Sequence, residues 1–293
     1  MIKYDVAIAY RCYPWISKTP KYRSTDKLAM ITWWLKSMVK CLWALKAKFF
    51  IIADWIPKEW KDKIIQSLWK CDYEYIYTDH IGNNWTYGKQ IEILLNQNDS
   101  EIVYFAEDDY LYNIFDKEWW KEGISLLKNK KADFISLFDH LAIYKNYLHK
   151  YKKDFIITEN KIRKTEASTC LTFMTTKKTL KETKKVFDLY TRWCWDYPMR
   201  TILTKKNNFR LFDVDYNYKL WLPWNKKPSL IQKLLKNFPY WTVCFFMSRI
   251  YWAKYILFWK KYKLFIPTPS ITTHLESDDI APLIHWDDVF RKL

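Results

Sequence analysis

The sequence predicts an α/β fold in which a mostly parallel sheet carries helices on both faces. Short apolar and aromatic runs alternate with segments of helical spacing through the first half of the chain, which is typical of such sheets. At 293 residues the chain is long enough to bury a large core. Hydrophobic residues make up 49% of it and aromatic residues 19%, a composition that argues against disorder.

The first half of the chain contains five runs with strand character. They cover residues 4–10, 48–54, 73–79, 101–109 and 132–139. The clearest helix lies between the first two runs, and Ser24, Thr25 and Asp26 are candidates for its N-cap. Its apolar positions recur at helical spacing, at Leu28, Ile31, Leu35, Met38, Leu42 and Leu45.

The second half of the chain is less regular. Strand-like pieces are expected near 155–158 and 169–175, followed by a charged helix and by a helix that carries "RWCWDYPMRTIL". Further on, "FRLFDVDYNY" has strand character and "SLIQKLLKNF" has helical spacing. The proline-rich tail from Ile266 to Phe290 is expected to be extended rather than regular.

The charge balance points to anionic partners. Lysine and arginine number 49 against 32 aspartate and glutamate, a formal net charge of +17. This favours nucleotides, nucleic acid or an acidic membrane surface, although lysines that solvate an aromatic-rich surface give the same composition. With glycine at Gly82, Gly88 and Gly123 alone, there is no G-x-G-x-x-G and no G-x-x-x-x-G-K-[ST]. Dinucleotide-binding and P-loop proteins are therefore disfavoured.

The cysteines and apolar segments bear on location. The six cysteines form no C-x-x-C pair. Without a signal-peptide pattern, we expect reduced thiols in a cytoplasmic protein. No uncharged apolar run reaches the length of a membrane-spanning helix, and the nearest, 241–261, is interrupted by Arg249 and Lys254. Its aromatic and basic residues fit either a peripheral contact with a membrane interface or a buried packing element.

Acidic residues gather at the ends of the predicted strands. Asp54, Asp79, the triplet 107–109 and Asp139 end four of the five strands. Ligands of open parallel sheets bind at the carboxyl ends of the strands. Aspartate is also common in turns, so each of these acids alone is weak evidence for a ligand site. The prediction of a site rests on the four strand ends together.

The triplet Glu107, Asp108 and Asp109 predicts a divalent metal site, although surface turns and helix caps account for many acidic triplets. Like charges crowded at a partly buried strand end need a cation or hydrogen-bond donors. Mn²⁺ or Mg²⁺ prefers oxygen ligands and is held by one or two carboxylates plus substrate phosphates. Side chains alternate along an extended chain, so Glu107 and Asp109 are expected on one face as metal ligands.

Five segments follow one another between residues 4 and 200, namely "FFIIAD", "GNNWTYGKQIEIL", "YFAEDDYLY", "STCLTFMTT" and "WCWDYPM". In this order they resemble the GT-A fold of nucleotide-sugar-dependent glycosyltransferases, and family 2-type members most. The resemblance implies a nucleotide-sugar and acceptor domain over 1–222 and a C-terminal extension over 223–293 that packs on or near the active site. It also implies a hexosyltransferase type of activity with Mn²⁺ or Mg²⁺ as cofactor.

The resemblance implies roles for single residues. Glu107 and Asp109 would bind the metal, completed by His274 in "PSITTHLES", and Asp196 would act as base on the acceptor hydroxyl in an inverting reaction. The residues implied on the donor side are Asp54 for the base, Asp79 for the base or ribose, Asp108 for the sugar or ribose, and Gly82, Asn83, Asn84 and Lys89 along the nucleotide.

The sequence departs from the glycosyltransferase pattern at some positions, and other functions remain alternatives. The metal element reads E-D-D rather than D-x-D, and no Gln-x-x-Arg-Trp-like motif of processive synthases occurs, which favours single addition to a glycan, lipid-linked or protein acceptor. A retaining reaction would use the same donor site. A basic nucleic-acid-binding protein with an aromatic stacking surface is the main alternative, although acids at strand ends would repel a phosphate backbone. A nucleotidyltransferase is a more distant alternative, because it would need a glycine-rich loop after the first strand and this sequence has none there.

Overall fold

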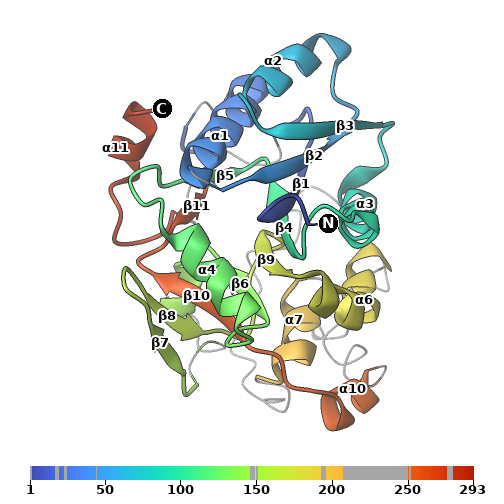
Figure 1. Cartoon of the computed structure of the whole chain (residues 1–293), viewed down its shortest axis with the longest axis vertical. Coiled ribbons are helices and arrows are strands. Elements are labelled where there is room, and N and C mark those ends of the chain that lie inside the picture. Colours follow the sequence, from blue (N-terminus) through green and yellow to red (C-terminus); the bar gives the residue numbers. More distant parts are fainter. Residues whose placement is uncertain are drawn as a thin grey trace, which may run out of the picture.

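A computed structural model of the chain describes residues 2–16, 20–22, 25–43, 45–145, 149, 151–192, 196–206, 250, 252–275 and 280–293. Within these residues the strands form a nine-stranded mixed sheet and a two-stranded sheet, with helices packed on both faces of the larger one (Figure 1). The predicted α/β class is confirmed.

The large sheet is mostly parallel. Its order is β3 (Asp72–Thr78), β2 (Ala47–Asp54), β1 (Val6–Cys12), β4 (Ile102–Glu107), β9 (Phe173–Thr176), β6 (Phe134–Ser136), β10 (Leu264–Thr268), β8 (Ile162–Thr165) and β7 (Phe155–Ile157). The first four strands are parallel, and β9 and β8 run against the others. The small sheet pairs β5 (Tyr110–Tyr112) with β11 (Thr272–His274).

The helices contribute to two hydrophobic cores, one on each side of the sheet. The first side takes α1 (Lys27–Leu42), η1 (Lys58–Trp60), α2 (Lys61–Gln66), α4 (Trp119–Lys128) and α11 (Trp286–Arg291). The second side takes α3 (Gly82–Asn96), α6 (Lys177–Arg192), α7 (Asp196–Thr204) and α10 (Ala253–Phe258). The short helix α5 (Ala142–Lys145) follows β6.

Alternation along the central strand explains the two cores. Val6, Ile8 and Tyr10 of β1 enter one core, whereas Ala7 and Ala9 enter the other. Successive side chains of a strand point to opposite faces, so a strand covered on both sides is apolar throughout. All seven residues of β1 are buried, Arg11 among them.

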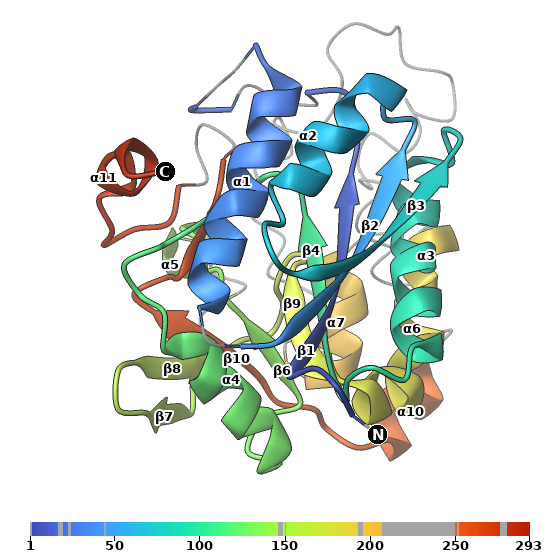
Figure 2. The same cartoon turned by 45° about the horizontal axis from the view of Figure 1, so that its top comes forward.

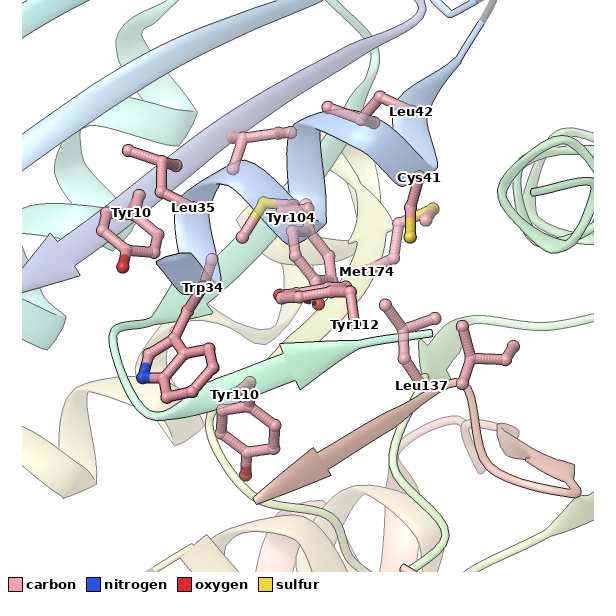
Figure 3. Packing of buried hydrophobic residues seen from close by; sticks show 14 of the residues in the cluster. Tyr10, Trp34, Leu35, Cys41, Leu42, Tyr104, Tyr110, Tyr112, Leu137 and Met174 are labelled. Carbon is pink, nitrogen blue, oxygen red and sulfur yellow. Dashed lines mark hydrogen bonds between the residues drawn. The ribbon is translucent and has the colours of Figure 1, made fainter. Parts of the chain in front are cut away.

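Helix α1 forms where the sequence predicts it. Among the three N-cap candidates, the Asp26 side chain accepts a hydrogen bond from the backbone amide of Ala29 at 2.9 Å. Its apolar face lies over aromatic residues of the sheet (Figure 3). There the hydroxyl groups of Tyr104 and Tyr112 are 2.9 Å apart, so these two buried hydroxyls pair with each other.

The tail departs from the prediction. The expectation that it lacks regular structure is wrong, because β11 forms within it and β10 and α11 overlap its two ends. Strand β10 lies between β6 and β8 and gains hydrogen-bond partners on both sides. Tertiary pairing thus orders a segment whose local sequence favours turns. The predicted elements in "FRLFDVDYNY" and "SLIQKLLKNF", residues 241–249 and 251 of the segment 241–261, and the proposed boundary at 222 lie outside the described residues.

Along the described parts of the chain, no helix combines the length and the apolar character that crossing a bilayer requires.

Candidate active site

The acidic triplet lies where β4 ends, at the carboxyl edge of the parallel strands. Glu107 is the last residue of β4, and Asp108 and Asp109 form the turn into β5. The arrowheads of β1, β2, β3 and β4 point to this same edge (Figure 2). Each of the three carboxylates pairs with a cationic or ionisable side chain from a different element.

Glu107 is held by Arg11 at the end of β1. The Arg11 guanidinium donates to one carboxylate oxygen, and the Thr172 hydroxyl donates to the other at 3.0 Å. Arg11 also donates to the Asn83 carbonyl at 2.7 Å and to the Thr86 hydroxyl at 3.3 Å. Burial raises the pKa of Glu107, and the positive charge of Arg11 opposes that rise.

Asp108 is held by the start of α1 and the residue after β1. The ammonium of Lys27 lies 2.8 Å from its Oδ2, and the Tyr13 amide donates to the same oxygen at 2.9 Å. Both side chains of the ion pair are largely buried, at 9% and 13% exposure. Burial raises the pKa of Asp108 against the opposing charge of Lys27.

Asp109 pairs with His274 of β11. The distance between His274 Nε2 and Asp109 Oδ2 is 2.9 Å. Burial alone would raise the pKa of Asp109, but the charge and hydrogen bond of His274 lower it. Its other oxygen, Oδ1, is buried and has no hydrogen-bond partner among the described residues.

Two of the predicted metal ligands fit a divalent ion. Asp109 and His274 are brought together, and a buried carboxylate oxygen without a partner is suited to a hard cation. Both oxygens of Glu107 accept bonds from protein groups. No set of three or more His, Cys, Asp or Glu side chains converges for a metal in the described ranges. A bound ion would therefore take its further ligands from substrate oxygens or water.

Asp54 is placed to fix a turn. It is 1% exposed, and it accepts hydrogen bonds from the Thr78 hydroxyl at 3.0 Å and from the amides of Ile81 and Gly82 at 2.9 and 2.8 Å. Gly82 has φ +81°, a conformation that glycine adopts without a steric penalty. These bonds fix the turn between β3 and α3.

The other donor-side predictions divide into two groups. Asp79, Asn83 and Asn84 are exposed at or just before the start of α3, close to the edge that carries the acids. Lys89 lies about two turns further along α3, where its ammonium pairs with Glu92 at 3.1 Å. The structure therefore does not bring Lys89 to the acidic cluster.

Asp196 is the first residue of α7. It acts electrostatically on the Cys170 thiol, whose pKa is raised well above the ordinary value by burial, by Asp196, and by Glu107 and Asp109. Trp193 and Trp195 lie outside the described residues.

Sequence reasoning missed Arg11 and Lys27. A charged residue inside the apolar run "VAIAYRC" is the signal that could have found Arg11, since a cation buried in a strand needs an opposite charge. Lys27 directly follows the N-cap aspartate. A positive charge in the first turn of a helix is unfavourable because of the helix dipole, so a lysine there indicates a nearby negative partner.

Comparisons with known proteins give structural similarities alone. No protein-family model and no curated protein sequence matches the chain. Among solved structures, S. aureus TarS 1–349 in complex with UDP is 12% identical over 67% of this chain and 54% of that chain, with a TM-score of 0.43. Mannosyltransferase PcManGT from Pyrobaculum calidifontis, in complex with GDP-Man and Mn²⁺, is 10% identical over 70% and 53%, with a TM-score of 0.44.

The galactosyltransferase LgtC, in complex with donor and acceptor sugar analogs, is 10% identical over 66% of this chain and 68% of that chain, with a TM-score of 0.40. The alignments span about half the length of the TarS 1–349 and PcManGT chains. Because each of these TM-scores is below 0.5, the similarities do not assign the chain to a family.

Proposed function

We propose that this chain is a glycosyltransferase that moves a sugar from a nucleoside-diphosphate donor to an acceptor hydroxyl. The observation that supports this most is the buried Oδ1 of Asp109, which has no hydrogen-bond partner in the described part of the chain. It lies beside the His274 imidazole, at the carboxyl edge of parallel strands. Open α/β sheets bind their ligands at this edge. Arg11 and Lys27 neutralise the two neighbouring carboxylates, so that a negatively charged donor can approach.

Asp109 and His274 are the residues that would hold Mn²⁺ or Mg²⁺. When bound, such an ion would supply positive charge that stabilises a leaving diphosphate. Glu107 acts here through Arg11, because the pair ties the end of β4 to the first turn of α3. Asp79 stays a proposed contact to the base or ribose, and Asp108 stays a proposed contact to the sugar or ribose. Asn83 and Asn84 stay proposed contacts to the base, ribose or diphosphate.

Asp196 is the proposed base in an inverting reaction. A carboxylate at the start of a helix is stabilised in its charged form by the helix dipole, and the charged form is the one that accepts a proton. The acceptor would be a glycan, a lipid-linked sugar or a protein, with peripheral membrane contact in the second case.

A screen of nucleotide sugars tests this proposal. The full chain is incubated with each donor and Mn²⁺, and release of free nucleotide is measured. We expect release from at least one donor and its loss in Asp109→Asn. Asp188→Asn, which alters an acid in a surface ion pair with Lys184, is the matched control and should retain activity. Full activity of Asp109→Asn, or no release from any donor, would contradict the proposal.

A further inference from the structure

Strand β7 is the outermost strand at one end of the large sheet (Figure 1), and among the described residues it pairs with β8 alone. Two of its three residues expose large apolar side chains, since Phe155 is 62% exposed and Ile157 is 80% exposed. Ile162, which lies opposite Ile157 on β8, is 48% exposed. Ile156 points to the other face and packs against the core. Phe155, Ile157 and Ile162 thus form an apolar patch on the outer face of this hairpin, which we call the β7 patch.

The backbone of β7 has an open edge beside this patch. The residues that flank the strand, Asp154 and Thr158, each make a backbone hydrogen bond of 2.9 Å to the β8 side of the hairpin. Bonded residues alternate along an antiparallel pair, so Phe155 and Ile157 direct their amides and carbonyls away from β8. No hydrogen bond within the described part of the chain occupies these four groups. An apolar strand with such an edge is a template for pairing with another strand.

The sequence around β7 is complementary to itself in antiparallel orientation. When Phe155 of one copy lies opposite Ile157 of a second copy, both outward-facing residues of each strand enter hydrogen-bonded pairs. The same register places Lys153 of one copy opposite Glu159 of the other. Changing the register by two residues would instead place Lys153 opposite Lys161 or opposite Ile157 and lose this charge pair.

We infer that β7 mediates a dimer in which the large sheets of two copies join edge to edge, with Ile156 of each copy at the two-fold axis. The contact is closed, because both copies use the same strand. Lys153 also contacts Glu166 in its own chain, so Glu159 of the second copy extends an existing ion pair. A lipid surface would cover the apolar side chains but leave the strand edge without hydrogen bonds, and it therefore fits this surface less well. A contact of this size predicts a reversible dimer.

The dimer leaves the candidate active site of each copy free. Strands β9, β6, β10 and β8 separate β7 from β4, whose end carries the acidic triplet. Because β7 and β4 run in the same direction, an antiparallel join turns the carboxyl edges of the two sheets in opposite directions. Nucleotide release per chain should therefore be the same in monomer and dimer. The inference and the proposed function can then fail independently.

Sedimentation velocity of the full chain at protein concentrations up to about 200 μM tests this inference. We expect the wild type to shift from monomer to dimer as the concentration rises. Phe155→Lys/Ile157→Lys should weaken dimerisation at least tenfold, because the introduced lysines would lie opposite one another across the join. Leu257→Lys/Phe258→Lys is the matched control, since these side chains of α10 are 61% and 86% exposed, and it should dimerise as the wild type does.

Three results would overturn the inference. They are a wild type that stays monomeric over the whole concentration range, unchanged dimerisation of Phe155→Lys/Ile157→Lys, and an equal loss of dimer in the α10 control.

Disulfide cross-linking tests the register. An equimolar mixture of Phe155→Cys and Ile157→Cys should form a cross-linked dimer under mild oxidation, because the Cα atoms of a hydrogen-bonded pair lie about 5.5 Å apart, within reach of a disulfide. Either variant alone should cross-link several-fold less, since each position would lie diagonally from its own copy. The wild type gives the background from the native cysteines. Cross-linking of the mixture that does not exceed that of the single variants would contradict the proposed pairing.

Discussion

Replacing Arg11 with Met removes the cation that holds Glu107 and leaves a carboxylate in a largely buried position. The side chains of the pair are 8% and 18% exposed. Removing one partner of a buried ion pair costs about 3–5 kcal/mol, mainly because the other charge remains without compensation. Thr172 still donates to Glu107, so we expect a loss of about 3 kcal/mol in the free energy of unfolding.

The assay is urea unfolding of the wild type, Arg11→Met, Glu107→Gln and the double variant. In this cycle the double variant should be more stable than Arg11→Met, because glutamine carries no charge that needs a partner. Lys184→Met is the matched surface control: Lys184 is 46% exposed, pairs with Asp188, and its loss should cost less than about 1 kcal/mol. Equal losses for Arg11→Met and Lys184→Met would refute the view that the pair is a buried structural unit.

Three further predictions concern stability. Asp54→Ala should lower the free energy of unfolding by about 2–4 kcal/mol, because two amides and one hydroxyl lose their acceptor. A loss below about 1 kcal/mol in urea unfolding would contradict the role of Asp54 in fixing the turn. Gly88→Leu should lower the free energy of unfolding by about 1–3 kcal/mol in the same assay. A Cβ atom at position 88 would already lie 3.1 Å from Thr191 Cγ2, where α3 packs on α6. Wild-type stability of this variant would show that the two helices can move apart without an energetic cost. Burial would raise the pKa of Glu166, but hydrogen bonds from His149, Lys153 and Tyr151 lower it below the ordinary 4.5. The charged carboxylate therefore stabilises the fold at pH values above 4.5, and this stabilisation is lost as pH falls through the pKa of the folded state. The wild type should be more stable than Glu166→Gln at neutral pH, and this difference in the free energy of unfolding should shrink below about pH 4. A difference that does not change with pH would contradict the prediction.

Local signals made much of the fold predictable. Short apolar and aromatic runs indicated the strands of the first half, and the spacing from Leu28 to Leu42, with Asp26 as cap, indicated α1. The acids at strand ends were predictable because parallel strands end at a common edge.

Contacts between distant parts of the chain were not predictable. Arg11 and Glu107 are 96 residues apart and Asp109 and His274 are 165 apart, so no local pattern joins them. The same holds for β10, whose strand conformation depends on pairing with β6 and β8. Asp54 illustrates a different limit, since a strand-end acid can bind a ligand or fix a turn and the sequence is the same in both cases.

The site at Asp109 is tested most directly by anomalous diffraction at the manganese edge, on crystals grown with Mn²⁺ and UDP. We expect an anomalous peak at the Asp109 carboxylate and the His274 imidazole, in contact with a phosphate oxygen of the nucleotide. Bound UDP with no peak at these two side chains would contradict it.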